Sequence, residues 1–403
     1  MSSVSAAPPD RIVGLDGLRG VAALVVVILH SLLLSSAFVD PFVDPRPTDA
    51  DPLMWWLTYS PLHLAWEGTV AVYVFFVLSG FVLCLPARKR GVQWRAYYPS
   101  RLVRLYLPVW ASVVLAIAWI LFTPRLAEGS AFVQIHQDPI PIAVLRDLIL
   151  VVPAQPGWTN TVLWSLKWEV LFSLLLPLYL LFALRLRKFL PLKIALLLVV
   201  MTVGAYEGPI ERPYAMSALF QLPIFALGCL LAMEWEKVIA WRDRLRHARL
   251  TFVIVGVVAA ACMMSYWTVF VLPVESAMIE ALAPLTRVLQ VVGALLAVLL
   301  VIASPGLGAA LSVTPLRWLG TRSFSLYLVH EPMIVALGRV IGEPPVAGSV
   351  LLVTIPVALL MAEVFFRVVE RPSHLLASRI GRTISARAKP AARPDPTPSP
   401  VPD

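Results

Sequence analysis

Charged residues, cysteines and lysines are all scarce in this sequence of 403 residues. Only 14% of the residues are charged, compared with about 25% in an average soluble protein, and 59% are hydrophobic. One soluble core cannot bury so much apolar sequence, because such cores stop growing at roughly 250–300 residues. These deficits exclude a soluble enzyme, a nucleic-acid-binding module and a small disulfide-stapled domain. They predict a protein that crosses a membrane several times.

The cysteines give no indication of cross-links or metal binding. Cys84, Cys229 and Cys262 all lie in apolar runs, without a C-x-x-C pair or the spacing of Cys/His metal ligands. We therefore expect small buried thiols, no disulfide and no metal site.

Ten apolar runs of about 20 residues, bounded by charged residues or proline, predict ten membrane-spanning helices. The expected fold is an all-α integral membrane protein, a bundle of about ten transmembrane helices. We expect a short segment at 1–12, a membrane domain at 13–370 and a tail at 371–403 that is disordered from about residue 386. The predicted spans are 14–35, 65–86, 101–122, 161–183, 189–206, 214–234, 250–271, 285–304, 319–341 and 347–368.

The distribution of positive charge predicts the orientation of the chain. The formal net charge is +9, and six of the 33 basic residues are lysines. If the N-terminus is inside, only six basic residues fall in outer segments, which is the bias expected when the basic loops are cytoplasmic. Both termini are then cytoplasmic. We expect a multi-pass protein of the cytoplasmic membrane, whose basic surface faces the lipid bilayer and not nucleic acid.

Two segments outside the spans also carry predictions. Residues 140–152 are apolar but too short to cross the bilayer, which predicts an interfacial or re-entrant helix. The motif Glu370-Arg-Pro372 follows the tenth span and predicts the end of that helix, together with a salt bridge at the inner membrane face.

Ionisable residues inside a membrane are costly and therefore point to function. In the first span, Arg19 and His30 are eleven residues apart, which places them on one helix face about 16 Å apart along the axis. Gly14, Gly17 and Gly20 allow close backbone approach there. The alternatives are a structural buried histidine at position 30, and an Arg19 that reaches the membrane surface or pairs with Asp16.

Three other spans carry polar pairs. Arg101 and Arg104 could hold a phosphate with two guanidinium forks, or could anchor the helix to lipid headgroups. Glu169 should lie at the depth of His30, where a carboxylate would orient the imidazole, unless it forms a structural ion pair. Ser165 shares its helix face.

The ninth span carries Tyr327 and His330 near mid-membrane, where they could line a cavity or be structural. His63, His136, His247 and His374 are assigned no role.

Five motifs occur in order on five of these spans: Asp16-Gly-Leu-Arg-Gly followed by His30, Phe76-Val-Leu-Ser-Gly-Phe81, Arg101-x-x-Arg104, Trp164-Ser-x-x-x-Glu169 and Ser325-Leu-Tyr-Leu-x-His330-x-Pro332. Together they resemble the membrane acyltransferase-3 family, over about residues 11–372. The resemblance implies a ten-helix enzyme that takes an acyl group, often acetyl, from acyl-coenzyme A on the cytoplasmic side. The acceptor is a hydroxyl of a glycan, or of a macrolide or another polyketide.

Many glycan-modifying members of that family carry an additional extracytoplasmic hydrolase-like domain. Only about 30 polar residues follow the last predicted span here. We therefore expect a stand-alone form, for which a polymeric acceptor is less favoured.

The resemblance and the spacing together suggest roles for individual residues. Coenzyme A phosphates would bind Arg19, Arg101 and Arg104. His30 would act as general base, oriented by Glu169, or would carry the acyl group itself. The remaining candidates for substrate contact are Asp16, Trp164, Ser165, Tyr327 and His330.

Two other classes of protein remain open at this stage. A proton-coupled transporter or exporter would also place His, Glu and Arg in the membrane, although the chain shows no repeated halves. A scaffold protein would not need polar residues at matching depths. The sequence predicts no particular oligomeric state.

Overall fold

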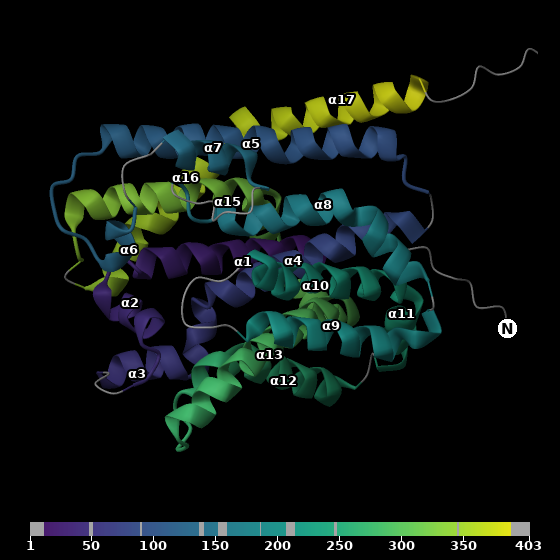
Figure 1. Cartoon of the computed structure of the whole chain (residues 1–403), viewed down its shortest axis with the longest axis horizontal. Coiled ribbons are helices and arrows are strands. Elements are labelled where there is room, and N and C mark those ends of the chain that lie inside the picture. The colour runs from purple at the N-terminus through teal and green to yellow at the C-terminus, as the bar shows by residue number, and fades with distance from the viewer. Residues whose placement is uncertain are drawn as a thin grey trace, which may run out of the picture.

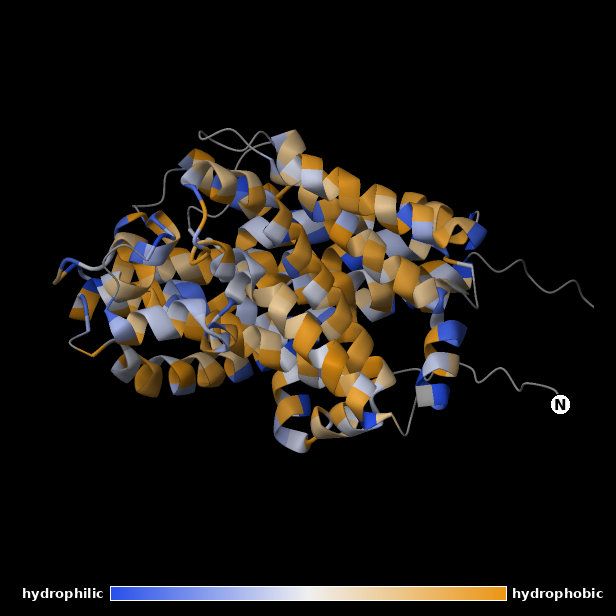
Figure 2. Ribbon diagram, turned by 90° about the horizontal axis from the view of Figure 1, so that it is seen from below, coloured by the Kyte–Doolittle hydropathy of each residue, from blue (hydrophilic) through white to orange (hydrophobic). Residues whose placement is uncertain are grey.

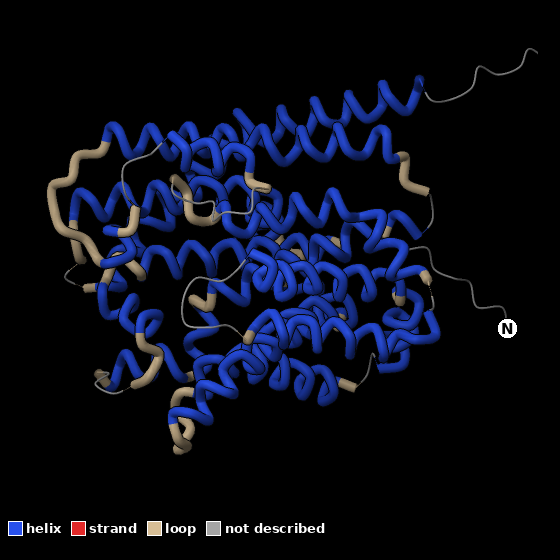
Figure 3. The backbone as a smooth tube through the Cα atoms, viewed as in Figure 1, coloured by secondary structure: helices blue, strands red, loops and turns tan. Residues whose placement is uncertain are grey.

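Helices make up nearly all of the secondary structure, and the described part of the chain contains no strand (Figure 3). This confirms the predicted all-α fold. The computed structural model describes residues 12–47, 51–88, 91–136, 141–151, 159–185, 187–206, 214–245, 248–344 and 346–387.

Ten helices form the bundle, and they lie where the ten apolar runs predicted spans. Nine of the described helices are long and apolar enough to cross a membrane, and the tenth, α4, is an apolar helix of 17 residues. Apolar residues dominate these helices, and hydrophilic residues concentrate toward their ends and the loops (Figure 2). The ten are α1 (Val13–Leu32), α4 (Gly68–Cys84), α5 (Trp94–Phe122), α8 (Leu163–Leu184), α9 (Leu190–Ala205), α10 (Tyr214–Met233), α12 (Arg249–Val269), α13 (Ser276–Ala303), α15 (Thr314–Ile341) and α16 (Leu351–Phe365).

Short helices connect the spans. We call the end of the bundle that carries the start of α1 the inner end, which the charge distribution assigns to the cytoplasm. In the segment predicted as interfacial or re-entrant, α7 packs on the side of α5, where Trp110 and Tyr106 donate to the carbonyls of Leu148 and Ile149. A short helix is therefore confirmed there. The connecting helices are α2 (Ser36–Val43), α3 (Pro52–Tyr59), α6 (Ala131–Gln134), α7 (Pro141–Ile149), α11 (Trp235–Leu245) and α14 (Pro305–Ala310).

The first span runs through the middle of the bundle, between α5 and α17 (Arg371–Arg387) on one side and α12 and α13 on the other (Figure 1). It crosses α15 at Gly20 and Gly320. A Cβ on Gly20 would lie 2.7 Å from the backbone nitrogen of Gly320, and one on Gly320 would lie 1.9 Å from the carbonyl oxygen of Asp16. Gly17 lies against the end of α14, where a Cβ would be 1.9 Å from the carbonyl oxygen of Leu311. Any larger residue would force the backbones apart, so the predicted close approach at Gly17 and Gly20 is confirmed.

The tenth span does not end at Glu370-Arg-Pro372, and that prediction was wrong. A π-helical segment, Phe366–Glu370, connects α16 to α17, a further helix of 17 residues. Pro372 is the second residue of α17 and directly follows the π-helical segment, whose wider turn already departs from the α-helical bonding pattern that proline interrupts. Oε1 of Glu370 lies 3.7 Å from Nε2 of His374, and Glu370 accepts from the Ser325 amide at 3.1 Å. The tail predicted to be disordered lies mostly outside the described residues.

The expectation that no cysteines are bonded was also wrong. Cys84 of α4 and Cys229 of α10 form a disulfide, with their Cα atoms 5.3 Å apart. The two residues are 145 positions apart in sequence, so no local spacing could indicate the pair. They meet because α4 and α10 pack closely: a Cβ on Gly228 would lie 2.1 Å from the Val77 carbonyl oxygen.

Candidate active site

Three arginines gather near the inner ends of α1 and α5. Nη2 of Arg101 lies 2.7 Å from Oε1 of Glu169, and its Nε donates to Oγ of Ser173 at 3.2 Å. Glu169 also accepts from the Ser79 hydroxyl at 3.3 Å. The side chains of Arg101 and Glu169 are 12% and 20% exposed, so the ion pair is sheltered but can still be reached.

The other two arginines have fewer partners. Nε of Arg104 donates to Nε2 of His374 at 3.1 Å, and the residue is exposed. Arg19 is half-buried, close enough to Glu169, Asp16 and Arg101 for electrostatic interaction. No hydrogen bond or ion pair joins Arg19 to a described residue. Arg19 and Arg104 therefore have guanidinium donors that no described carboxylate accepts, which suits an anionic ligand.

A cleft of about 980 Å³ opens beside this cluster. One wall is the first part of α5, including Arg101 and Arg104, and the other wall is α17. The sequence analysis did not expect a helix there, so it could not predict the cleft.

Polar side chains continue from the arginines toward the outer end. Ser165 and Tyr327 are buried, and their hydroxyl oxygens lie 2.7 Å apart. The Tyr327 hydroxyl also donates to the carbonyl of Val162 at 3.2 Å. Ser165 lies one helical turn from Glu169, and Tyr327 lies about one turn from His330. This pair therefore connects the inner arginines with the outer histidines, and both members were predicted from the sequence.

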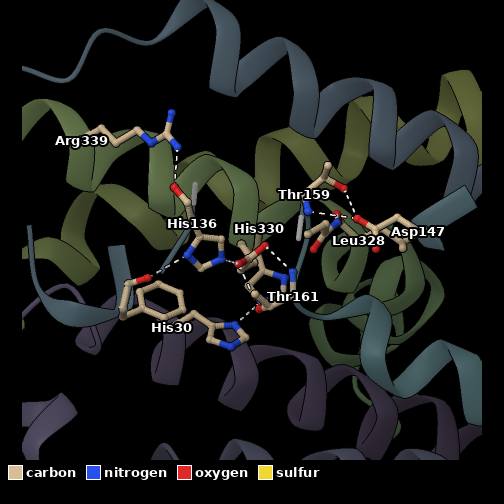
Figure 4. Close-up of polar contacts among 11 residues, drawn as sticks. His30, His136, Asp147, Thr159, Thr161, Leu328, His330 and Arg339 are labelled. Carbon is tan, nitrogen blue, oxygen red and sulfur yellow. Dashed lines mark hydrogen bonds and ion pairs between the residues drawn. The ribbon is translucent and has the colours of Figure 1, made fainter. Parts of the chain in front are cut away.

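His30 meets His330 at the outer end of this polar column (Figure 4). Nδ1 of His330 lies 2.9 Å from the carbonyl oxygen of Leu326, which only accepts, so this nitrogen carries a proton. In neutral His330, Nε2 is then an acceptor, and Nδ1 of His30 donates to it at 2.8 Å. Nε2 of neutral His30 is thereby left unprotonated, and no described residue hydrogen bonds to it. This geometry leaves His30 with an unprotonated ring nitrogen and allows His330 to orient its ring.

A further imidazole, that of His136, lies on the outer side of His30 and His330. Nδ1 of His136 donates to the Phe132 carbonyl at 2.7 Å, and its Nε2 is in an ion pair with Glu331. Thr161 donates to Glu331 through its hydroxyl at 3.0 Å and its amide at 3.2 Å. Burial lowers the pKa of His136, but the charge and hydrogen bond of Glu331 outweigh it, so the pKa is raised. Both ring nitrogens of His136 face oxygen acceptors, an arrangement that suits an imidazolium, which can donate from each. The Phe132 ring lies between the imidazoles of His136 and His30 and stacks on His30, with 5.5 Å between ring centroids.

The pair of His136 and Glu331 was not predicted from the sequence. His136 was assigned no role, because it lies in a loop between predicted spans. Glu331 could have been found, since it is a carboxylate inside a predicted span, directly after His330.

Glu169 does not lie beside His30 as predicted; it lies toward the inner end with Arg101. The cause is the chain before α8, which enters the bundle. Thr159 and Asn160 are buried, Asp147 accepts from the Thr159 amide at 3.0 Å, and Asn160 donates to the Leu328 carbonyl at 2.8 Å (Figure 4). Because α8 begins inside the bundle, Glu169 lies about two helical turns closer to the inner end than its distance from the loop suggested.

The remaining candidates lie at the edges of the column. Asp16 stands in the first turn of α1, where its backbone contacts Gly320. Trp164 is half-buried and packs edge-on against Phe76 at 6.4 Å between ring centroids. Neither residue contacts the histidines. Their roles in substrate binding, like the catalytic and phosphate-binding roles above, stay predictions.

The described residues contain no group of three or more metal-ligating side chains.

Comparison with known proteins shows which sequences this chain resembles. YrhL of Bacillus subtilis (strain 168), which bears the provisional name of a peptidoglycan O-acetyltransferase, is 27% identical over 382 residues, covering 89% of this chain and 54% of YrhL. The O-acetyltransferase OatA of Staphylococcus aureus (strain NCTC 8325 / PS 47) is 24% identical over 388 residues, covering 90% of this chain and 57% of OatA. The acyltransferase MdmB of Streptomyces mycarofaciens is 31% identical over 177 residues, covering 42% of this chain and 40% of MdmB.

The chain thus spans about half the length of the first two relatives. No solved structure matches it significantly. The acyltransferase domain family matches residues 12–363, nearly the whole described chain. This multi-pass membrane protein belongs to the membrane acyltransferase-3 family.

Proposed function

We propose that this protein is an O-acyltransferase of the cytoplasmic membrane that moves an acyl group, acetyl in the first instance, from acyl-coenzyme A to a hydroxyl. The observation that carries the proposal is the hydrogen bond between His30 and His330, which leaves Nε2 of His30 unprotonated and free to act as a base. The names of YrhL and OatA, both O-acetyltransferases, support the reaction class.

The donor would enter from the inner end. Its phosphates suit the guanidinium groups of Arg19, Arg101 and Arg104, because such groups bind phosphate oxygens in pairs. Its pantetheine arm would extend along the polar column past Ser165 and Tyr327. The span of about 16 Å between Arg19 and His30 along α1 suits a long, thin arm.

The reaction would then take place at His30. Nε2 removes the proton from the acceptor hydroxyl as its oxygen attacks the thioester carbonyl carbon. The carbon–sulfur bond breaks, and the thiolate of coenzyme A leaves and takes the proton from His30. A second route, in which Nε2 attacks the thioester and carries the acyl group, uses the same free nitrogen. Rapid quenching would detect an acylated His30 in the second route and none in the first.

The acceptor is proposed from the relatives. The name of YrhL indicates peptidoglycan, so a hydroxyl of a glycan is the first choice. A macrolide or another polyketide is the second, from the family resemblance. The outer location of His30 favours an acceptor that reaches it from the outer side of the membrane.

The test is mass spectrometry of products from the purified protein with acetyl-coenzyme A and each acceptor class in parallel. We expect an acceptor heavier by one acetyl group and free coenzyme A in equal amount, and neither with His30→Ala. Hydrolysis of acetyl-coenzyme A without a modified acceptor would refute the proposed transfer. Passage of an unmodified acceptor across proteoliposomes would instead indicate a transporter.

A further inference from the structure

The α17 helix presents one face to the cleft. The residues on this face follow the spacing i, i+3, i+4, i+7, i+8 and i+11, which is that of a single helical stripe. Most of them are small, so the stripe leaves room between α17 and α5, and its two large members are a histidine and an arginine. The stripe consists of His374, Ala377, Ser378, Gly381, Arg382 and Ser385.

The opposite wall has the same kind of surface. Tyr97, Ser100, Arg101 and Arg104 of α5 line the cleft at the spacing i, i+3, i+4 and i+7. The two helices approach closely at Gly381, where an added Cβ would lie 3.6 Å from the Cβ of Ser100. Residues on α17 and on α5 can therefore contact one ligand between them.

The cleft is strongly cationic. Arg101, Arg104 and Arg382 all line it, and no described lining residue is acidic. Arg101 is paired with Glu169 outside the cleft lining, and Arg104 donates to a neutral acceptor, His374. Arg382 is exposed and forms no hydrogen bond or ion pair with a described residue. At least one full positive charge in the cleft is thus uncompensated.

The size of the cleft limits its occupant. Its volume of about 980 Å³ is at the upper end of the roughly 300–1,000 Å³ found for small-molecule sites. An inorganic anion would leave most of it empty, whereas a nucleotide with several phosphates matches its volume and its charge. The cleft also adjoins the polar column, because Arg101 belongs to both.

We infer that α17 forms half of a nucleotide site, in which Arg382 of α17 and Arg104 of α5 hold phosphates of the acyl donor from opposite sides. Ser378 and Ser385 are placed to donate hydrogen bonds to the same phosphates. The inference rests on the proposed function, because the nucleotide is that of acyl-coenzyme A. A lipid phosphate would have the same chemistry, so the experiment must separate the two sources.

The experiment compares two donors in purified full-length protein. Acetyl-coenzyme A carries the nucleotide and its phosphates, and acetyl-pantetheine lacks both. For Arg382→Gln we expect kcat/KM for acetyl-coenzyme A to fall about tenfold through KM, because a charge-assisted phosphate contact is lost. The value for acetyl-pantetheine should not change. Arg382→Lys, which keeps the charge without the fork, should recover part of the loss.

Arg379→Gln is the matched control. Arg379 is an exposed arginine of the same helix that does not line the cleft. It should retain the wild-type preference for acetyl-coenzyme A to within about twofold, because its guanidinium lies outside the site.

Each of the following results would overturn the inference. Arg382→Gln could lower kcat/KM equally for both donors, or Arg379→Gln could match it, and α17 would then act on the fold or the membrane surface. In nanodiscs with and without phosphatidylglycerol, an effect that requires the anionic lipid would assign the cleft to a lipid phosphate. If wild-type protein transfers acetyl from acetyl-coenzyme A but Arg382→Gln leaves kcat/KM unchanged, only this inference fails. If wild-type protein uses neither donor, the proposed function fails with it.

Discussion

The two ends of the polar column differ in how completely their polar atoms are paired. At the inner end, neither Arg104 nor Arg19 forms an ion pair with a described carboxylate, and Arg104 faces an open cleft. At the outer end, His330 and Glu331 are fully buried and hydrogen bonded on each side. An incompletely paired, accessible cluster can exchange water for a ligand, whereas a saturated, buried one is held in a fixed geometry. This difference supports the proposed division, with donor binding at the inner end and the chemistry at the outer end.

The sharpest test of this division is His30→Ala. Because it removes the proposed base, we expect acyl transfer to fall by about 10³-fold, within the usual range for general-base catalysis. The affinity for acetyl-coenzyme A should stay within about twofold, since the inner cluster is untouched. Isothermal titration and turnover on the same preparation check both values. A variant that loses affinity as much as turnover would contradict the separation of the two ends.

The next effect concerns stability at the outer end. Glu331→Gln removes the carboxylate from a buried ion pair and should cost about 3 kcal/mol, measured as thermal unfolding in detergent. The pKa of His136 is raised in the folded protein, so the pair stabilises fully below about pH 6.5, and its contribution is lost as the pH rises through that raised value. The gap between wild type and Glu331→Gln should therefore narrow at alkaline pH. A constant gap would show that His136 is not an imidazolium.

The orientation of the base is tested by His330→Phe. The ring volume is largely kept, but the acceptor for Nδ1 of His30 is lost, so the tautomer is no longer fixed. We expect kcat to fall by about 10²-fold and KM to change little. Tyr179→Phe is the control, because it removes a half-buried hydroxyl of α8 that donates to the Leu222 carbonyl and does not touch His30. Equal losses in both variants would mean that general packing matters more than the imidazole pair.

The smallest expected effect is at the inner end. Arg104→Ala should raise KM for acetyl-coenzyme A about tenfold with kcat nearly unchanged, because a charged contact to phosphate contributes to ground-state and transition-state binding alike. Arg104 is a better test than Arg101, whose removal would also leave Glu169 without its partner. A fall in kcat alone would place Arg104 in the chemistry and weaken the comparison.

Much of the fold was predictable from the sequence, because the bilayer imposes long apolar helices. All ten bundle helices lie in the predicted apolar runs. The continuation of the last span was not predictable in this way. A charged residue shortly before a proline, as at Glu370 and Pro372, usually ends a helix, but here a π-helical segment continues into α17. The cleft depends on α17.

The site was predicted in part. Spacing along one helix placed Arg19 with His30 correctly on α1, and Ser165 and Tyr327 do meet across helices. The predicted depth of residues within the bundle was less accurate, because it was counted from loops assumed to lie at the membrane surface. The segment at Thr159 and Asn160 lies inside the bundle, which moved Glu169 away from His30 and brought His330 to it instead.

The crossing between α1 and α15 at Gly20 and Gly320 determines how precisely His30 is placed. Gly20 lies 10 residues from His30, about 15 Å along a rigid helix. A rotation of about 5° at the crossing would move the imidazole by about 1.3 Å over this distance. A displacement of this size would break the hydrogen bond between His30 and His330, whose ring nitrogens are 2.8 Å apart. The position of the imidazole at the outer end therefore depends on the absence of two side chains nearer the inner end, at Gly20 and Gly320.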